Sequence, residues 1–314
     1  MRPSSKGVMM MEAEATLHGW VVIDKPLGVT SNRAVQQVRR CTGGKVGHAG
    51  TLDPLATGVL PVALGEATKT AQYATRGHKR YRFAIRWGEA RSTDDAESEV
   101  VAESSARPDR DAIEAALPLF VGTVLQRPPA YSALKIAGRR AYALARGNRP
   151  PTLPPRPVEI LELQLIALRD RDHAEFAALV GKGTYIRALA RDLASALGTL
   201  GHVTELRRLS VGRFTERQAI SLDSIASLRH SLAGSGYVLP IETALDGIPA
   251  MVLTAEEAAR LRHGQQVAPR DPTELARLDR LEDGAIVVTR DDQGLVGLAR
   301  IDNGSLRPVR IINR

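Results

Sequence analysis

Residues 47–60 read GHAGTLDPLATGVL, a stretch that holds one acid, Asp53, among glycines, small residues and leucines. Its glycines predict a backbone that turns tightly or that another group can approach closely. Its larger apolar side chains are expected in the core: Leu52, Leu55, Val59 and Leu60. A carboxylate in such company is costly to bury. Asp53 is therefore either an ordinary turn acid before a proline or a functional group, and the rest of the chain has to decide between the two.

An α/β pattern surrounds this stretch. Residues 20–26 predict a buried strand, and residues 30–42 predict a helix that Thr30 or Ser31 can cap and that Gly43 ends. Residues 80–87, RYRFAIRW, alternate between apolar and basic side chains, which predicts a strand with one wet face. Further along the chain, the patterns predict a helix over 109–120, strands over 158–168 and 174–180, and a helix over 184–198.

The helix predicted over 184–198 has two distinct faces. Its core stripe is expected to be Ile186, Leu189, Leu193 and Leu197. Arg187 and Arg191 lie four residues apart on another face. Such arginines are either solvent-facing and paired with neighbouring acids or turned toward a site, and the helix pattern alone leaves both open.

The chain divides near residues 233–250, where glycine and proline interrupt the pattern. We expect a loose N-terminal tail over 1–17, a main domain over 18–249 and a small β-rich domain over 250–314. The chain of 314 residues has one cysteine, Cys41, which excludes an internal disulfide and a cysteine-rich metal site. No membrane span or secretory signal is visible, so a cytoplasmic location is expected.

Charge indicates the kind of partner. The net charge is +8, yet residues 250–314 carry 10 basic and 10 acidic side chains, so the excess lies in the first 249 residues. Residues 126–158 contain seven basic side chains and no acid. A solvated basic face would explain this segment, but basic residues interleaved with tyrosines between proline pairs favour contact with an RNA backbone. We interpret residues 127–157 as a thumb-like insertion, with these candidate backbone contacts: Arg127, Lys135, Arg139, Arg140 and Arg146.

Several chemistries are excluded by the motifs that are missing. The phosphate-binding loop of nucleotide hydrolases, the ligand spacing of zinc deaminases and a dinucleotide fingerprint are all absent from the sequence. The seven histidines show no metal-ligand spacing. We therefore expect Asp53 to act without a metal or cofactor.

Six motifs in order carry a resemblance to a known family. They are VVIDKPLGVTSN, VGHAGTLDPLATGVLPVALGEATK, KRYRFAIRWG, QRPPAYSALKIAGRRAYALARG, GKGTYIRALARDL and GHVTELRRLSVGRF, which span about Gly19 to Phe214. In this order they resemble the bacterial tRNA pseudouridine-55 synthases, the TruB family. The related ribosomal-RNA synthases carry a different motif, HRLD, which this chain lacks.

This resemblance implies a fold and a reaction. The fold is α/β of the α+β kind: a catalytic domain with a central mixed sheet flanked by helices, the basic thumb and a small PUA-like C-terminal RNA-binding domain. The reaction converts a uridine of the tRNA T-loop, at position 55, to pseudouridine with no cofactor. The base is flipped into the pocket, and Asp53 is the nucleophilic carboxylate. The partner is the T-arm of tRNA. We expect a monomer and no protein partner.

The resemblance also implies roles for other residues. Arg187 is the cation that keeps Asp53 ionised, and Tyr81 stacks on the flipped uracil and removes its C5 proton. The positions matched to substrate contact are His48, Tyr185 and Leu206, together with Lys25 and Lys69, for which the resemblance implies either contact with phosphate or support of a loop. Taken alone, Tyr81 is an ordinary apolar-face residue of a strand.

The chain departs from the family in one loop. Where the family often has Gly-x-x-Thr-x-Thr-x-Asp-x-x-Gly, this chain reads GEARSTDDAES over 88–98. Arg91 replaces the first threonine and Ser98 the last glycine, while Thr93 and Asp95 remain. The conformation of this loop is therefore an open question for the structure.

Two other functions fit parts of the sequence. A non-catalytic tRNA-binding or folding chaperone would tolerate the loss of Asp53, and a nucleoside hydrolase would need a second, water-activating acid. Residue types leave open whether Asp53 attacks C1′ of the sugar, attacks C6 of the base, or promotes a glycal route.

Overall fold

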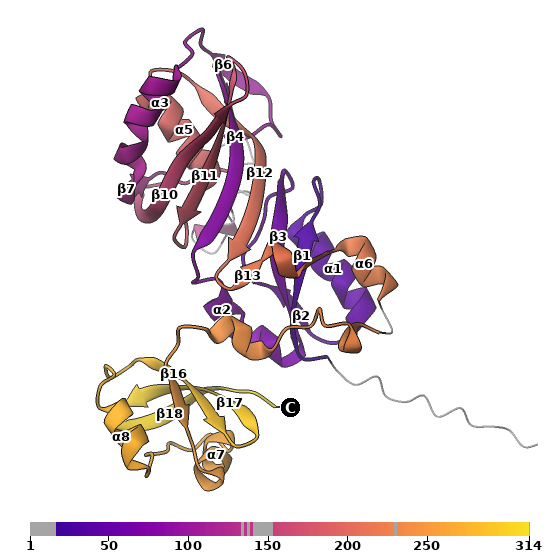
Figure 1. Ribbon diagram of the computed structural model, residues 1–314, viewed down its shortest axis with the longest axis vertical. Helices are drawn as coiled ribbons and strands as arrows, with labels where there is room; N and C mark the ends of the chain where they lie inside the picture. Colours follow the sequence, from indigo (N-terminus) through magenta and orange to yellow (C-terminus); the bar gives the residue numbers. More distant parts are fainter. Residues whose placement is uncertain (1–16, 133–134, 137–138, 141–152, 229–230, 314) are drawn as a thin grey trace, which may run out of the picture.

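A computed structural model describes residues 17–132, 135–136, 139–140, 153–228 and 231–313. Within these ranges no helix is both long and apolar enough to cross a membrane. The fold is mixed α/β, as the sequence predicts, with one large sheet and a second, smaller one (Figure 1). Most of the N-terminal tail expected over 1–17 lies outside the described residues.

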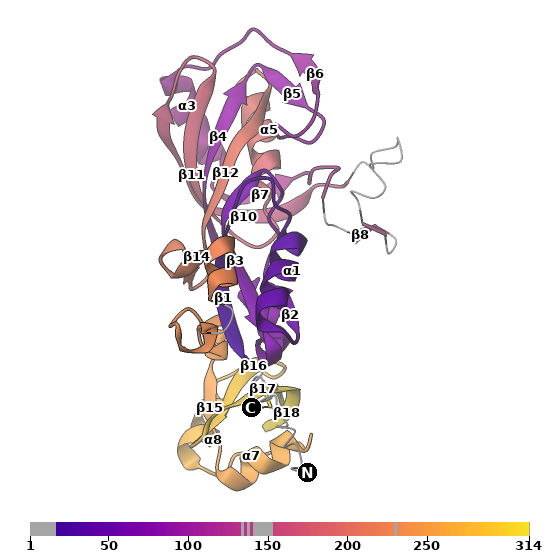
Figure 2. The same cartoon turned by 90° about the vertical axis from the view of Figure 1, so that its right-hand side faces the viewer.

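The large sheet extends along the long axis of the molecule (Figures 1 and 2). Its described strands run in the order β14-β1-β3-β12-β4-β11-β10-β7, with β2 paired to β3 and β13 to β12. The pairs β1–β14 and β3–β12 are parallel and the other pairs antiparallel, so the sheet is mixed. The strands are β1 (Gly19–Lys25), β2 (Val46–His48), β3 (Ala56–Leu64), β4 (Lys79–Trp87), β7 (Gly122–Gln126), β10 (Arg156–Leu168), β11 (His173–Val180), β12 (Gly201–Val211), β13 (Phe214–Thr215) and β14 (Ala219–Ser221).

Helices pack against this sheet in two groups. In the N-terminal half, α1 packs against α6 beside β1 and β3; in the other half, α5 packs on β12 and α3 on β10 (Figure 1). The main-domain helices are α1 (Ser31–Thr42), α2 (Ala71–Ala74), α3 (Arg110–Ala116), α5 (Ile186–Ala196) and α6 (Leu222–Ser227). Short 3-10 turns cover 65–70, 117–120, 216–218, 232–234 and 241–245. The helix predicted over 109–120 therefore ends as a 3-10 turn.

Local sequence signals explain two of these elements. The Thr30 hydroxyl accepts a hydrogen bond from the Arg33 amide and caps α1, and Gly43 ends the helix with a φ of 63°. In β4 the alternation holds, since Tyr81, Phe83, Ile85 and Trp87 are buried.

Strands β3 and β12 meet at a glycine. Gly58 has a φ of 95°, and a Cβ built on it would lie 2.3 Å from the backbone oxygen of Arg208. Only glycine allows this approach. It brings the start of β3, and with it Asp53, next to the middle of β12.

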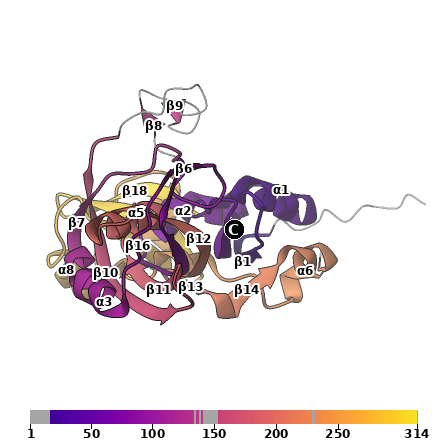
Figure 3. The same ribbon diagram turned by 90° about the horizontal axis from the view of Figure 1, so that it is seen from above.

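Two short hairpins form small sheets of their own. One pairs β5 (Glu89–Arg91) with β6 (Val100–Glu103), and the other pairs β8 (Lys135–Ile136) with β9 (Arg139–Arg140). The β8–β9 hairpin belongs to the predicted thumb and stands away from the sheet (Figures 2 and 3). The intervening residues 133–134, 137–138 and 141–152 lie outside the described ranges.

The C-terminal part is a four-stranded sheet in the order β15-β16-β17-β18. Its elements are β15 (Ala250–Val252), α7 (Ala255–Arg262), α8 (Pro272–Leu278), β16 (Ile286–Asp291), β17 (Gly294–Asp302) and β18 (Ser305–Ile311). Val288, Leu298 and Ile312 share a buried cluster with Trp20 and Phe214 of the main domain. This shared apolar contact attaches the C-terminal sheet to the base of the large sheet.

Candidate active site

Asp53 lies in the loop between β2 and β3, at the edge of a cavity of about 260 Å³. Its side chain is 40% exposed, so a molecule in the cavity can reach its carboxylate. The Ala56 amide donates to the backbone oxygen of Asp53 at 3.0 Å, which makes this segment a tight turn. Asp53 is therefore both a turn residue and a cavity residue.

The turn is held by the N-terminus of α1. The Ser31 hydroxyl donates to the backbone oxygen of Leu52 at 2.9 Å and accepts from the Leu52 amide at 2.8 Å. Both residues are buried. The Gly28 amide donates to the oxygen of Pro54 at 2.9 Å. The backbone on both sides of Asp53 is thus fixed by partners from outside its own loop.

Lys25 also bonds to the turn that bears Asp53. Its ammonium is fully buried and donates to the backbone oxygens of Pro26 (2.9 Å), Val29 (2.5 Å) and Pro54 (3.3 Å). Burial lowers the pKa of Lys25 to about 8, against an opposing effect of the Glu97 and Asp53 carboxylates. Among the described residues, the cavity lining does not include Lys25. Of the two roles considered for Lys25, its contacts favour support of the loop that bears Asp53 over contact with the substrate.

Arg208 is a second buried cation that sequence reasoning missed. Its guanidinium donates to the backbone oxygens of Val59 (2.8 Å), Gly50 (3.0 Å) and Thr51 (3.4 Å). It therefore ties β12 to the residues just before Asp53. Nothing in the motif around it marks Arg208, because its partners are backbone carbonyls from a segment more than a hundred residues away.

Arg187 is the cation opposite Asp53, and it is buried. Its Nε lies 3.0 Å from Asp53 Oδ2 and 3.4 Å from Asp95 Oδ2. Its Nη1 donates to the oxygen of Thr93 at 2.7 Å and its Nη2 to the oxygen of Tyr131 at 2.9 Å. The solvent-facing alternative for Arg187 is thus wrong, because four acceptors from three separate segments surround the guanidinium.

Asp95 is the second acid on Arg187. It is 2% exposed, and it lies beside the start of β12 through an isolated parallel bridge to Val203. The loop around it also carries Glu97, whose carboxylate accepts a hydrogen bond from the Leu55 amide. Burial, with the nearby Asp95 and Asp53 charges, raises the pKa of Glu97. One loop thus reaches both Arg187 and the turn that bears Asp53.

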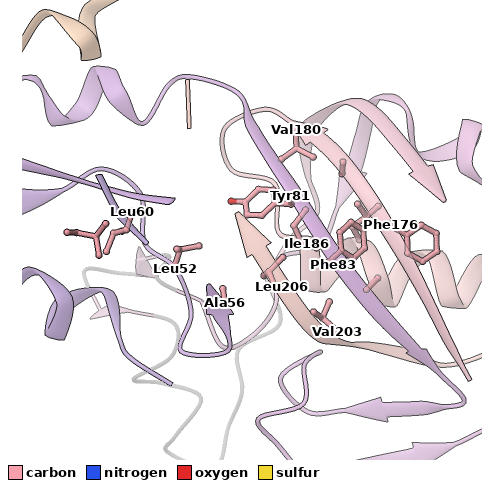
Figure 4. Close-up of a cluster of buried hydrophobic side chains, with 14 of the residues drawn as sticks. Leu52, Ala56, Leu60, Tyr81, Phe83, Phe176, Val180, Ile186, Val203 and Leu206 are labelled. Carbon is pink, nitrogen blue, oxygen red and sulfur yellow. The ribbon is translucent and has the colours of Figure 1, made fainter. Parts of the chain in front are cut away.

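Tyr81 and Leu206 form an apolar wall of the cavity. They belong to adjacent strands, β4 and β12, and each is 8% exposed. Figure 4 shows the Tyr81 hydroxyl directed toward the side on which Leu52 lies. Behind Tyr81, the same cluster continues through Phe83 and Phe176. The lining of this cavity thus combines the apolar side chains of Tyr81 and Leu206 with the Asp53 carboxylate.

Tyr185 lies at the N-terminus of α5 and also lines the cavity. The buried Gln126 amide holds its backbone from both sides: Gln126 Oε1 accepts from the Tyr185 amide at 2.8 Å, and Nε2 donates to the Tyr185 oxygen at 3.1 Å. The Arg156 guanidinium lies 5.5 Å from the centre of the Tyr185 ring. Gln126 was not singled out from the sequence, although it fixes the residue two before Arg187.

Two predicted substrate contacts lie elsewhere. His48 ends β2, where it pairs with Val62, and it is absent from the described cavity lining. The Lys69 ammonium lies 2.6 Å from Glu66 Oε2 and donates to the backbone oxygen of Ile311 at 2.8 Å. Lys69 thus bonds to the last strand of the C-terminal sheet, and its position favours a role in attaching that sheet.

The predicted RNA-backbone residues are only partly described. Arg127 is exposed, and its backbone oxygen accepts from Arg191 at 2.7 Å. For Lys135, Arg139 and Arg140 the structure describes the backbone of a hairpin but not the side chains. Arg146 lies outside the described residues.

Five of the predicted site residues line the same cavity: Asp53, Tyr81, Tyr185, Arg187 and Leu206. Lys79 and Arg208 line it as well. Burial lowers the pKa of Lys79 to about 8, and its ammonium donates to the oxygens of Thr75 and Gly77. The half-exposed Asp53 carboxylate is paired with the buried Arg187 guanidinium. Such a carboxylate is suited to act as a nucleophile toward a small planar ligand. In the described ranges, no group of three or more potential ligands could hold a metal ion.

Three family models match consecutive parts of the chain. Residues 36–186 match the N-terminal domain of the TruB family of pseudouridylate synthases. Residues 187–246 match a tRNA pseudouridylate synthase B C-terminal domain, and residues 249–312 match a pseudouridine synthase II TruB C-terminal model. The boundary between the last two falls just before the C-terminal sheet.

Curated proteins and solved structures resemble the chain over most of its length. A tRNA pseudouridine synthase B of Rhodospirillum rubrum is 49% identical over 298 residues, 95% of this chain and 97% of the relative. A protein of the same name from Bradyrhizobium diazoefficiens is 52% identical over 271 residues, 84% of this chain and 79% of the relative. Among solved structures, a chain from an H/ACA ribonucleoprotein bound to a substrate RNA containing 2′-deoxyuridine has a TM-score of 0.71 at 22% identity, covering 95% of this chain and 86% of that one. At this identity the likeness shows the fold alone.

Proposed function

The chain belongs to the TruB family of pseudouridine synthases, and on that premise we propose that it isomerises one uridine of the tRNA T-loop, at position 55, to pseudouridine. Its relatives of about 50% identity are named for the pseudouridylation of tRNA. The single observation that carries the proposal is the ion pair of Asp53 and Arg187 at a cavity of about 260 Å³.

The reaction is balanced without an oxidant, a reductant or a second substrate. The bond between uracil N1 and ribose C1′ breaks, the base turns, and a bond forms between C5 and C1′. C5 loses its hydrogen and N1 gains one, so the product is an isomer of the substrate. The step that needs help is the departure of the base, and a carboxylate nucleophile divides that step into two easier ones.

Asp53 is the proposed nucleophile. Its turn is anchored by Ser31 and Lys25, so the carboxylate keeps a defined position, and positional precision of this kind contributes strongly to rate. The Arg187 guanidinium, with its Nε 3.0 Å from Oδ2, fixes the carboxylate by an ion pair. Asp95, whose Oδ2 lies 3.4 Å from the same Nε, helps to hold the guanidinium in place.

Tyr81 is proposed to stack on the flipped uracil and to take the C5 proton. Its position beside Leu206, in the lining of the same cavity as Asp53, supports this role. A uracil within a folded T-loop cannot reach this wall in place, so the enzyme has to extrude the base and meet the cost of unstacking it. Tyr185 is proposed to contact the same nucleotide.

The surrounding surface is proposed to bind the T-arm. The basic segment 127–157 would contact the phosphate backbone, with recognition based on loop shape. The C-terminal sheet, which has no net charge over 250–314, is proposed as a small PUA-like RNA-binding domain that acts by shape more than by electrostatic attraction. We propose a monomeric, cytoplasmic enzyme.

The test is tritium release from a tRNA transcript labelled at uracil C5. The wild-type protein is expected to release tritium from one site, and a transcript whose T-loop uridine is replaced should release none. Asp53→Asn should abolish release while tRNA binding persists. Asp246→Asn serves as the matched control, because Asp246 is an exposed acid paired with Arg213 outside the cavity.

Other results of this experiment would support one of the alternative functions. Binding of tRNA without any release would identify the chain as a tRNA-binding or folding protein, and Asp53 as a turn residue only. Release of free uracil with an abasic site left in the tRNA would identify a hydrolase. Release from other uridines, with the T-loop site unaffected, would refute the proposed site of modification.

A further inference from the structure

The loop between β5 and β6, residues 92–99, holds one side of Arg187. The backbone oxygen of Thr93 accepts from Arg187 Nη1 at 2.7 Å, and Asp95 Oδ2 lies 3.4 Å from Arg187 Nε. The orientation of the guanidinium toward Asp53 therefore depends on where this loop places Thr93 and Asp95.

A chain of hydroxyl contacts fixes the Asp95 carboxylate. The Thr93 hydroxyl lies 2.5 Å from Asp95 Oδ1 and 2.8 Å from the Ser98 hydroxyl, and the Ser98 hydroxyl also accepts from the Thr93 amide at 3.1 Å. The Thr93 hydroxyl is thus the donor toward both Asp95 Oδ1 and the Ser98 Oγ, and Asp95 Oδ1 also accepts from the Glu97 amide at 3.0 Å. These bonds engage Asp95 Oδ1 and leave Oδ2 for Arg187.

Arg91 closes the loop from its other end. Its Nη1 donates to the backbone oxygen of Ser98 at 2.5 Å, and its Nη2 lies 3.3 Å from Glu89 Oε2. The Asp94 amide donates back to the oxygen of Arg91 at 3.1 Å. Asp94 carries the positive φ of this loop, 60°, so Ser98 needs no glycine-like conformation.

The two residues at which the chain departs from its family are thus direct partners. Arg91 and Ser98 lie seven positions apart in sequence and are joined by the guanidinium-to-carbonyl bond. The Ser98 hydroxyl also contacts the amide and the hydroxyl of Thr93, the residue whose backbone oxygen accepts from Arg187. Neither touches the cavity.

We propose that Arg91 and Ser98 form one coupled pair of positioning residues, which holds this loop in the conformation that orients Arg187 toward Asp53. The expected loss of rate rests on the proposed isomerisation. The effect on the orientation of the Arg187 side chain does not depend on that function. Arg91 holds the backbone of residue 98, and the Ser98 hydroxyl reaches Thr93 only from that backbone position, so loss of the Arg91 guanidinium also removes the effect of the Ser98 hydroxyl and the second loss adds little. This expectation separates a coupled pair from two independent supports.

A double-mutant cycle tests the coupling. The variants are Arg91→Met, which keeps the apolar stem, Ser98→Ala, and both together. Under single turnover at saturating enzyme, each single variant is expected to lower the rate constant about 10-fold, because the misplacement of one catalytic group by a fraction of an ångström costs rate on that scale. The affinity for tRNA should stay within about 2-fold, and the double variant should equal the slower single one.

A second readout follows Arg187 without catalysis. The Nε–H group of the buried Arg187 side chain, whose nitrogen lies 3.0 and 3.4 Å from two carboxylate oxygens, should give a slowly exchanging signal in ¹H–¹⁵N NMR spectra of the whole protein. Its hydrogen exchange should accelerate about 10-fold in each single variant and no further in the double variant. Arg110→Met is the matched control, since Arg110 forms an exposed pair with Glu114 on α3.

The outcomes separate the two levels of the inference. If the wild-type protein makes no pseudouridine, the proposed function fails, and the exchange of the Arg187 Nε–H still decides whether the pair positions that side chain. Unchanged exchange in both single variants would overturn the proposal. So would rate effects that multiply in the double variant, since Arg91 and Ser98 would then act independently.

Discussion

Replacement of Ser31 by alanine is expected to damage catalysis from a position that never meets the substrate. Ser31 lies in the first turn of α1, and its hydroxyl bonds to both backbone polar groups of Leu52, at 2.9 and 2.8 Å. Ser31 and Leu52 are 2% and 4% exposed. Ser31→Ala therefore leaves a buried N–H and a buried C=O without their partner.

The structure sets the size of the effect. A buried polar group without a partner costs about 1–3 kcal/mol, so the two groups of Leu52 together should lower the free energy of unfolding by about 2–4 kcal/mol once the turn relaxes in part. Relaxation would also move Asp53, the next residue, relative to Arg187. A shift of this kind should lower the single-turnover rate constant by roughly 10- to 100-fold.

Urea unfolding and single-turnover tritium release measure the two effects on the same variant. Thr254→Ala is the control: it removes an N-cap bond from α7 in the C-terminal sheet, costs about 1 kcal/mol, and should leave the rate unchanged. A Ser31→Ala protein that loses no more stability than this control and keeps its rate within about 2-fold would refute the view that α1 holds the Asp53 turn.

Two further predictions concern the other supports of the site. Burial lowers the pKa of Lys25 to about 8 from 10.5, so the unfolded chain binds more protons between these values. The stability of the wild type relative to Lys25→Met should therefore rise as the pH goes from 8 to 10.5, as measured by urea unfolding across this range; a flat or falling difference would contradict it. Gln126→Glu keeps the size of the side chain but removes the donor to the Tyr185 oxygen, and it should lower the single-turnover rate about 10-fold with little change in tRNA affinity. Gln126→Ala, which removes both bonds to Tyr185, should lower the rate at least as much, and a fully active Gln126→Glu protein would show that the bond to the Tyr185 oxygen does not matter.

Much of the fold could be predicted from local pattern. The alternation in β4 identified the buried face, because every second side chain of a strand points to the same side of the sheet. The capping residue and the glycine at the two ends of α1 were visible for a similar reason, since both act within a few residues of the helix. The 3-10 turn that follows α3 was not visible, because Pro118 alone does not say how a helix ends.

The candidate site was predicted less completely. Asp53, Tyr81, Tyr185, Arg187 and Leu206 meet at one cavity, in agreement with the motifs that named them. Lys25 and Lys69 recur in the same motifs, yet their ammonium groups bond to backbone carbonyls away from the cavity. A motif records that a residue type is needed, but it does not distinguish a residue that contacts a ligand from one that holds the loop beside it.

By itself, the sequence determined the α/β class, the single acid of the 47–60 turn and the family to which these motifs belong. Only the tertiary structure decided that Arg187 is buried between Asp53 and Asp95, and that Arg208 and Gln126 hold the backbone around them. The helix pattern of α5 placed Arg187 off the core stripe, where solvent would be the usual neighbour. Its acceptors come from segments more than fifty residues away in the chain, and an arginine can be buried only where such partners converge to compensate the loss of water.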